Sequence, residues 1–345
     1  MKIEVYSPTI RRKEMDAVLT AMVEDKIGPG EQAKFLIQTA REKLKFDFCL
    51  AVRSPAIALH LALKALNLVP GQAVCVSALS PLYYEWVIKD LGLVPLYCDV
   101  LSSTAYMGRE TVEKALASKR EGVDVRCAVL HHTLGYYPDA AAIAELGIPL
   151  IEDCSQSYGT RTGEAGESGS VGVFTILGLE ERDMLTSGGG ALLYSVNRRD
   201  AAVLRSLGEL PPEYGLPDMN AALAIVQFRE AEKNLEKRRE IARLYTQSAL
   251  RNRHKCFSQN DTEYNNYAFP LILETGMKDV KAYARRKDIA VEGAFENTLI
   301  GSGMVPPEQC PEAYSLSLRT VLFPLYPRLG TGNAEKVAKL ILTLP

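Results

Sequence analysis

The sequence has almost no net charge and no long apolar run. Its 40 lysines and arginines are balanced by 42 acidic residues, so no surplus of positive charge would attract a nucleic acid or an anionic membrane surface. The apolar stretch 56–68 is interrupted by His60 and Lys64 and is shorter than the roughly 20 residues that cross a bilayer. These absences argue against a nucleic-acid-binding protein and against a membrane protein.

Metal-binding and disulfide motifs are also missing. The seven cysteines are scattered, and none forms a C-x-x-C pair or stands at metal-ligand spacing from a histidine. The first residues, Met1 to Tyr6, lack the apolar segment of a secretory signal. We therefore expect reduced core cysteines, no bound metal and a cytoplasmic location.

Short apolar, β-branched runs alternate with helical patterns through residues 49–195. Continuous apolarity is typical of strands that are buried on both faces, and the helical patterns 56–66 and 140–146 fit crossover connections between them. The sequence therefore predicts an α/β protein with a mainly parallel sheet, whose ligands bind beyond the carboxyl ends of the strands. The predicted strands are 49–52, 73–77, 94–99, 125–130, 149–153, 171–176 and 191–194.

The pattern changes after Pro211-Pro212. A long helix is predicted from Asp218 to about Leu250, with its charged residues on one face. Beyond it, fewer strand signals are present, and only a strand at 268–273 and a last helix at 334–342 are predicted. We interpret residues 1–250 as a large domain and residues 251–345 as a small α+β domain.

Several motifs follow one another along most of the chain, and together they resemble one known family. They are Ala58–Gly71 (ALHLALKALNLVPG), Leu91–Asp99 (LGLVPLYCD), His132–Asp139 (HTLGYYPD), Ile151–Gly159 (IEDCSQSYG), Gly172–Thr175 (GVFT), Gly188–Leu193 (GGGALL), DMNAA and RREIA in the long helix, and Phe323–Pro327 (FPLYP). In this order they resemble the DegT/DnrJ family of pyridoxal phosphate (PLP) sugar aminotransferases.

The resemblance implies the type I fold of PLP-dependent transferases, which is similar to that of aspartate aminotransferase. That fold has a large domain with a mostly parallel sheet, a small α+β carboxyl-terminal domain, and a homodimer whose active sites lie at the interface. The resemblance also implies transfer of an amino group from glutamate to a keto sugar carried on a nucleotide.

The lysine that this reaction requires is absent. In the family it lies between a strand and a glycine-rich turn and holds PLP as a Schiff base. Here the matching segment is 175–188, and the sequence has no lysine between Lys119 and Lys233. The family position falls at Glu180, Glu181 or Arg182, depending on the register. Glutamate cannot form an imine and arginine stays protonated, so we predict no conventional catalytic residue and no covalently bound cofactor. The histidine of dehydratase relatives is missing from this segment too.

The phosphate cradle of the family is also depleted. Ser54 matches the first residue of a Ser-Gly-Thr turn at a helix start, which binds the cofactor phosphate in the family. Pro55 and Ala56 follow it, and they remove a backbone N–H and a hydroxyl. Bound PLP or pyridoxamine phosphate (PMP) is therefore disfavoured.

Other residues keep the family's site positions. Asp153 matches the partner of the pyridine nitrogen, Gln156 the residue beside the ring, and Thr175 a hydroxyl near the phosphate. His132 matches a strand-end position close to the substrate. Each also has a structural interpretation: Asp153 could cap a turn, Gln156 could bond to local backbone, and His132 could be a packed histidine. The aromatic group Tyr83, Tyr84 and Trp86 could line a pocket or belong to the core.

Three hypotheses follow for the function. The first is a divergent aminotransferase-like pseudoenzyme that binds a nucleotide sugar or regulates a catalytic paralogue. The second is an atypical enzyme on nucleotide-linked sugars that uses non-covalently held PLP or PMP, or no cofactor. The third is a structural dimerising module, which predicts a cavity filled by side chains.

Overall fold

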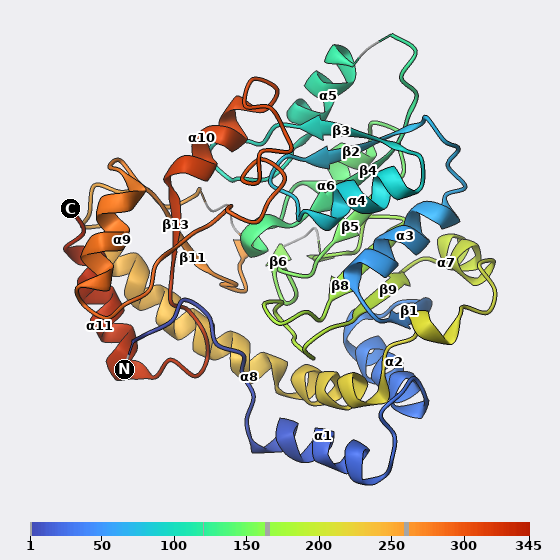
Figure 1. The fold of residues 1–345 in the computed structure, drawn as a ribbon, viewed down its shortest axis with the longest axis horizontal. Helices are drawn as coiled ribbons and strands as arrows, with labels where there is room; N and C mark the ends of the chain where they lie inside the picture. The colour runs from blue at the N-terminus through green and yellow to red at the C-terminus, as the bar shows by residue number, and fades with distance from the viewer. Residues whose placement is uncertain (1, 120, 163–165, 259–261) are drawn as a thin grey trace.

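A seven-stranded sheet forms the centre of the molecule (Figure 1). In the computed structural model, residues 2–119, 121–162, 166–258 and 262–345 are described. Along the sheet the order is β1-β9-β8-β5-β4-β2-β3, and only β9 runs against its neighbours. The strands are β1 (Phe48–Val52), β2 (Ala73–Ser77), β3 (Val94–Cys98), β4 (Val125–His131), β5 (Leu150–Asp153), β8 (Phe174–Gly178) and β9 (Ala191–Ser195).

All seven predicted strands are present, and the mainly parallel sheet is confirmed. Every residue of β2, β5, β8 and β9 is buried, which explains why these strands are mostly apolar rather than alternating. Glu152 and Asp153 of β5 are buried polar exceptions. The predicted start at residue 171 is three residues early, because Val171 and Gly172 turn toward Glu152 before the strand begins.

Helices cover both faces of the sheet. Val74 and Val76 lie in the same apolar cluster as Leu59 and Ile88, whereas Ala73 and Cys75 join a cluster on the opposite face. The first face is covered by α3 (Pro55–Ala65), α4 (Tyr83–Asp90) and α7 (Arg198–Arg205), and the second by α5 (Arg109–Ser118) and α6 (Ala140–Ala144).

The long predicted helix is confirmed as α8 (Asp218–Ala249), which crosses the lower part of the molecule in Figure 1. Its first half packs against α1 (Arg12–Val23) and α2 (Glu31–Leu44), and its second half packs against α11 (Thr331–Leu342). None of the helices formed by the described residues is both long enough and apolar enough to span a membrane.

The carboxyl-terminal part has its own small sheet. The predicted strand 268–273 is confirmed as β11 (Phe269–Ile272). The last helix, which was predicted to begin at residue 334, begins three residues earlier, at Thr331. Ile3 pairs with Ile289, so the chain begins beside this part (Figure 1). The remaining elements are β11 (Phe269–Ile272), β12 (Glu292–Gly293), β13 (Thr320–Phe323), α9 (Met277–Arg285), α10 (Pro311–Arg319), β6 (Arg161–Thr162), β7 (Gly166–Glu167), β10 (Thr262–Glu263), η1 (Thr133–Gly135) and η2 (Pro212–Tyr214).

The apolar cluster on the α3 and α4 face also includes residues from beyond position 250. Phe295, Leu299 and Leu316 are buried in it, so the later part of the chain contributes to the core of the central sheet. Six of the seven cysteines are buried as predicted. Cys256 is the exception and is exposed, in the connection that follows α8.

Candidate functional site

The candidate site lies at the carboxyl ends of β4 and β5. These parallel neighbours end at His131 and Asp153, which are paired in register, so their ends meet at one edge of the sheet. Ligands of such sheets bind beyond this edge. Because successive strand residues point to opposite faces, Glu152 and Asp153 belong to two separate polar clusters.

Asp153 is buried and accepts four hydrogen bonds. Its Oδ2 accepts from the hydroxyls of Tyr83, at 3.0 Å, and Tyr84, at 2.7 Å. Its Oδ1 accepts from the backbone N–H of Ser155, at 3.0 Å, and from the Ser155 hydroxyl, at 2.5 Å. A carboxylate offers about four lone-pair positions. All of them are therefore used within the chain.

The two tyrosines come from the first turn of α4. Their rings lie edge to face, with centroids 5.0 Å apart, and Tyr84 also meets the ring of His131 edge to face at 6.3 Å. Burial, reinforced by the charge of Asp153, raises the pKa of both hydroxyls well above the ordinary value, so they remain donors. Trp86, on the same helix, points outward and is 69% exposed.

The turn after β8 presents no amine to this cluster. Glu180, Glu181 and Arg182 are all exposed, and Arg182 forms an ion pair with Glu292 at 2.8 Å. The tyrosine hydroxyl of Tyr6 donates to the backbone carbonyl of Glu181. None of the three candidate lysine positions therefore packs against Asp153.

Asp183 is the acidic residue of this turn that packs inward, and it was not among the predicted site residues. Its Oδ2 accepts from the Glu180 N–H at 2.8 Å, and it lies so close to Gly178 that a Cβ there would be 2.3 Å away from it. Desolvation raises the pKa of Asp183 well above its ordinary value, although the hydrogen bond from the Glu180 N–H lowers it. The net shift favours the protonated acid. The apolar residues Met184 and Leu185, which follow it, could have indicated that this end of the turn packs inward.

Thr175 and Gln156 both bond to backbone. The Thr175 hydroxyl donates to the Gly169 carbonyl at 2.9 Å, and its side chain is fully buried. The Gln156 Oε1 accepts from the N–H of Leu134 at 2.7 Å. Leu134 has a φ of 57°, which is uncommon for a bulky residue, so Gln156 stabilises a strained turn. This matches the structural interpretation of Gln156.

Ser54 is the N-cap of α3. Its Oγ accepts from the backbone N–H of Ile57 at 3.2 Å, and Pro55 occupies the first helical position. The serine therefore already has a helix-capping role that needs no ligand.

Replacing this cap is expected to have a moderate cost. Ser54→Ala should lower the free energy of unfolding by about 1 kcal/mol, because the Ile57 N–H loses its acceptor. Urea denaturation would measure the change. Asp139→Ala is the matched control, since Asp139 caps α6 through the N–H of Ala142 at 3.0 Å. A cost at Asp139 alone would contradict the capping role of Ser54.

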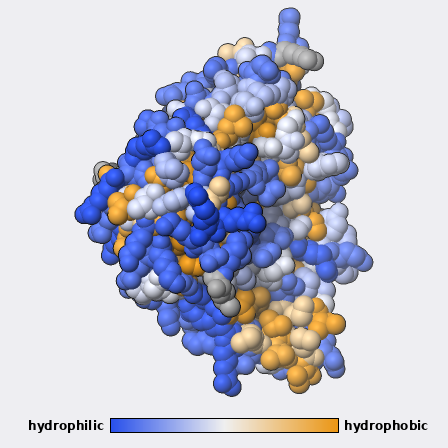
Figure 2. Space-filling view, turned by 60° about the vertical axis from the view of Figure 1, so that its left-hand side comes forward, coloured by the Kyte–Doolittle hydropathy of each residue, from blue (hydrophilic) through white to orange (hydrophobic). Residues whose placement is uncertain are grey.

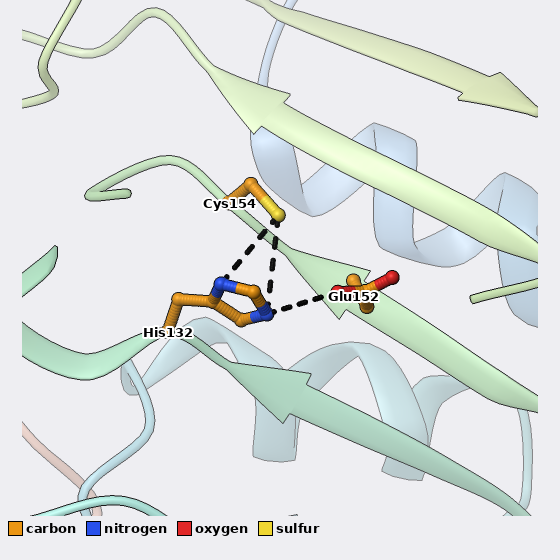
Figure 3. Close-up of side chains that lie close together, drawn as sticks. All are labelled: His132, Glu152 and Cys154. Carbon is orange, nitrogen blue, oxygen red and sulfur yellow. Dashed lines mark hydrogen bonds and ion pairs between the residues drawn. The ribbon is translucent and has the colours of Figure 1, made fainter. Parts of the chain in front are cut away.

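His132 lies on the other face of the sheet, in a buried cluster with Glu152 and Cys154 (Figure 3). The His132 Nε2 is 3.1 Å from Glu152 Oε2, and neither side chain is exposed. The His132 Nδ1 is 2.9 Å from the Ser157 hydroxyl and 3.0 Å from that of Ser168. Both ring nitrogens therefore have polar partners, as the packed-histidine interpretation expects.

The geometry of this cluster favours an ion pair over a metal site. The Cys154 Sγ is 3.8 Å from Nδ1 and 4.0 Å from Nε2, so it lies along the in-plane lone-pair direction of neither nitrogen. Burial lowers the pKa of His132, but Cys154 and Glu152 outweigh it and raise the pKa to about 10. The Glu152 pKa is lowered, since His132 and the N–H groups of Gly172 and Val171 overcome its burial. We assign a protonated histidine paired with an ionised glutamate.

The residues at the carboxyl edge do not fit PLP bound as the resemblance implies. A pyridine N–H needs a free acceptor on Asp153, and all four lone-pair positions already have donors. The turn from residue 180 to 182 offers two carboxylates and a guanidinium instead of an amine. Pro55 also lacks the N–H that a phosphate would bind at the start of α3.

Comparison with known proteins agrees with the fold. The family described as the DegT/DnrJ/EryC1/StrS aminotransferase family matches residues 8–342. A GDP-perosamine synthase from Vibrio cholerae is 24% identical over 329 residues, which cover 87% of each chain. A GDP-perosamine synthase from Escherichia coli O157:H7 is 25% identical over 263 residues, which cover 70% of each. The crystal structure of the aminotransferase TlmJ from Streptoalloteichus hindustanus superposes with a TM-score of 0.88, at 21% identity, over 98% of this chain and 97% of that one.

Proposed function

Because the chain belongs to the DegT/DnrJ/EryC1/StrS aminotransferase family, we propose that it binds a nucleotide-linked sugar at the carboxyl edge of its sheet without transaminating it. The family and the two GDP-perosamine synthases support the ligand class. The absence of transamination is supported by the four hydrogen bonds that Asp153 accepts from groups of the same chain, together with the lack of lysine from residue 120 to residue 232. Such a protein would act by holding the sugar or by regulating a catalytic paralogue, in the cytoplasm.

Two measurements test this function. Isothermal titration with GDP-linked and other nucleotide-linked sugars should give heat of binding, and a protein without a sugar site should give none. Added PLP should produce no stable visible absorbance band, and borohydride should fix no PLP to the chain. A lysine found joined to PLP would contradict the proposal and return the chain to the conventional transaminases.

A second candidate function is an enzyme on the same sugars that needs no covalently held cofactor. Asp183 is the observation that favours it: the residue is half-buried near Asp153, its pKa is raised well above the ordinary value, and a carboxyl that keeps its proton can act as a general acid. Turnover of a nucleotide-linked keto sugar that disappears in Asp183→Asn, with sugar binding retained, would support this alternative.

We also propose that the chain forms a homodimer through an apolar patch on α1 and α2. Met15, Leu19 and Met22 form one exposed stripe along α1, opposite the buried Ala21. The patch lies at the lower edge of the molecule in Figure 2, and a groove of about 450 Å³ between α1, α2 and α8 lies beside it. Single exposed apolar residues are ordinary, but a contiguous patch is typical of an interface. The patch consists of Met15, Leu19, Met22, Val23, Ile27 and Phe35.

A charge placed in this patch is expected to separate the subunits. Leu19 is 55% exposed, and Leu19→Glu would bury a carboxylate in the apolar contact, so the dimer should give way to monomer. Size exclusion with light scattering would measure the mass. The matched control is Leu318→Glu on α10, where the leucine is 58% exposed outside the patch. A dimer that survives Leu19→Glu would place the interface elsewhere.

A further inference from the structure

We infer that Tyr83 and Tyr84 stand in for the cofactor ring, so that Asp153 is a structural hub of the protein rather than a ligand contact. This inference rests on the proposed function, because it explains how the family site persists without its cofactor.

Every acceptor position of the Asp153 carboxylate is filled by donors of the chain itself. All four of its partners are donors, which is the pattern of an ionised, acceptor-only carboxylate. The Ser155 hydroxyl also accepts from the N–H of Gly178, at 2.8 Å, and so ties β8 to the same cluster. Asp153 therefore joins β5, β8 and α4 without any added molecule.

Tyr84 cannot be displaced at low cost, and Tyr83 is partly buried against the same cluster. Tyr84 is fully buried, belongs to the apolar cluster of the sheet, and contacts the rings of Tyr83 and His131. Moving it would leave a ring-sized void in the core, and such voids are strongly destabilising. A cofactor ring would have to compete with a side chain that is already part of the core.

The charge around Asp153 is also balanced without a cation. Among the described residues, no lysine or arginine forms an ion pair with it, and the negative charge is met by hydroxyl and N–H dipoles. The half-buried Asp183 nearby has a pKa well above its ordinary value, mainly through desolvation, and this favours its neutral form. Hydrogen bonds to a charged group are stronger than neutral ones, so these donors supply the stabilisation that a pyridinium would give.

The experiment compares Asp153→Asn with Asp90→Asn in the absence of any ligand. An asparagine cannot accept four hydrogen bonds, so Asp153→Asn should lower the Tm by about 3–6 °C. Asp90 is exposed at the end of α4, and its substitution should leave the Tm unchanged. Equilibrium dialysis should show that neither the natural protein nor the variant retains PLP. An unchanged Tm for Asp153→Asn, or PLP retention that falls tenfold or more in this variant, would overturn the inference.

If Asp153→Asn does not fold, the tyrosines provide the test. Tyr84→Phe removes one donor and keeps the ring, and it should lower the Tm by about 2–3 °C, whereas Tyr314→Phe on the surface of α10 should not. Equal Tm values for the two variants would overturn the inference. Failure of the proposed function gives a different result from failure of this inference. If the natural protein binds no nucleotide-linked sugar, the Tm differences between these variants are still expected.

Discussion

Replacing Glu152 with glutamine is expected to lower the free energy of unfolding by about 3–5 kcal/mol. The carboxylate lies 3.1 Å from the His132 Nε2, and both side chains are fully buried, so the substitution leaves a buried imidazolium without its partner. Glutamine keeps an oxygen for the N–H groups of Val171 and Gly172, which isolates the loss of charge. Urea denaturation followed by circular dichroism would measure the difference.

An exposed ion pair provides the control for this variant. Glu240 lies 2.7 Å from Lys237 on the surface of α8, where solvent screens the attraction. Glu240→Gln is therefore expected to leave the free energy of unfolding unchanged. Equal changes in the free energy of unfolding at the two positions would show that the buried pair stabilises the protein no more than an exposed one.

The same pair predicts a pH dependence. The folded pKa of His132 is about 10 and its ordinary value is 6.5, so the folded state binds the extra proton. Its stabilisation is complete below about pH 6.5 and is lost as the pH rises toward about 10. The free-energy difference between the natural protein and Glu152→Gln should shrink over this interval. A constant difference would contradict the assigned protonation.

Replacing Gly135 with alanine is expected to cost about 3 kcal/mol or more. Gly135 has a φ of 83°, and a Cβ there would lie 2.5 Å from the Asn265 Oδ1 and 2.9 Å from the Gln156 carbonyl oxygen. The first effect is backbone strain, of about 1–2 kcal/mol for an L-residue, and the second is overpacking, which typically adds about 1–3 kcal/mol. The variant therefore disrupts the turn that Gln156 holds.

Gly147→Ala separates the two effects. Gly147 has a similar φ of 76°, but no atom lies within 4 Å of its Cβ position. It should show only the strain of about 1–2 kcal/mol. Chemical denaturation of both variants measures the difference, which is the cost of the contacts. If the two glycines cost the same, the contacts around Gly135 are soft enough to yield.

The sheet could be predicted from the sequence because burial leaves a local signature. Most strands are short apolar runs, and α8, which is 32 residues long, carries its charged residues mainly over residues 229–243. The two-residue strands β6, β7, β10 and β12 were not predicted, because so short a segment has no period to detect. The division of the chain at residue 250 stays a prediction, and the shared cluster of Phe295, Leu299 and Leu316 adds a contact between the two parts.

The site was less predictable than the fold. The sequence located Asp153 at the end of a strand, but its tyrosine partners lie 69 and 70 residues earlier, and no local pattern pairs them. The period of two in a strand could have placed Glu152 and Asp153 on opposite faces in advance. It could not have shown that His132 and Cys154 meet Glu152 while Asp183 packs near Asp153.

By itself, the sequence determined which side chains are absent. No folding can supply an amine to a segment that has no lysine, so the chemistry available between residues 120 and 232 was settled by composition. Only the tertiary structure decided what occupies Asp153 instead, since hydrogen-bond donors from separate elements converge there when the sheet and α4 pack together. Composition is local and countable, whereas the partners of a buried carboxylate are chosen by the packing of distant segments.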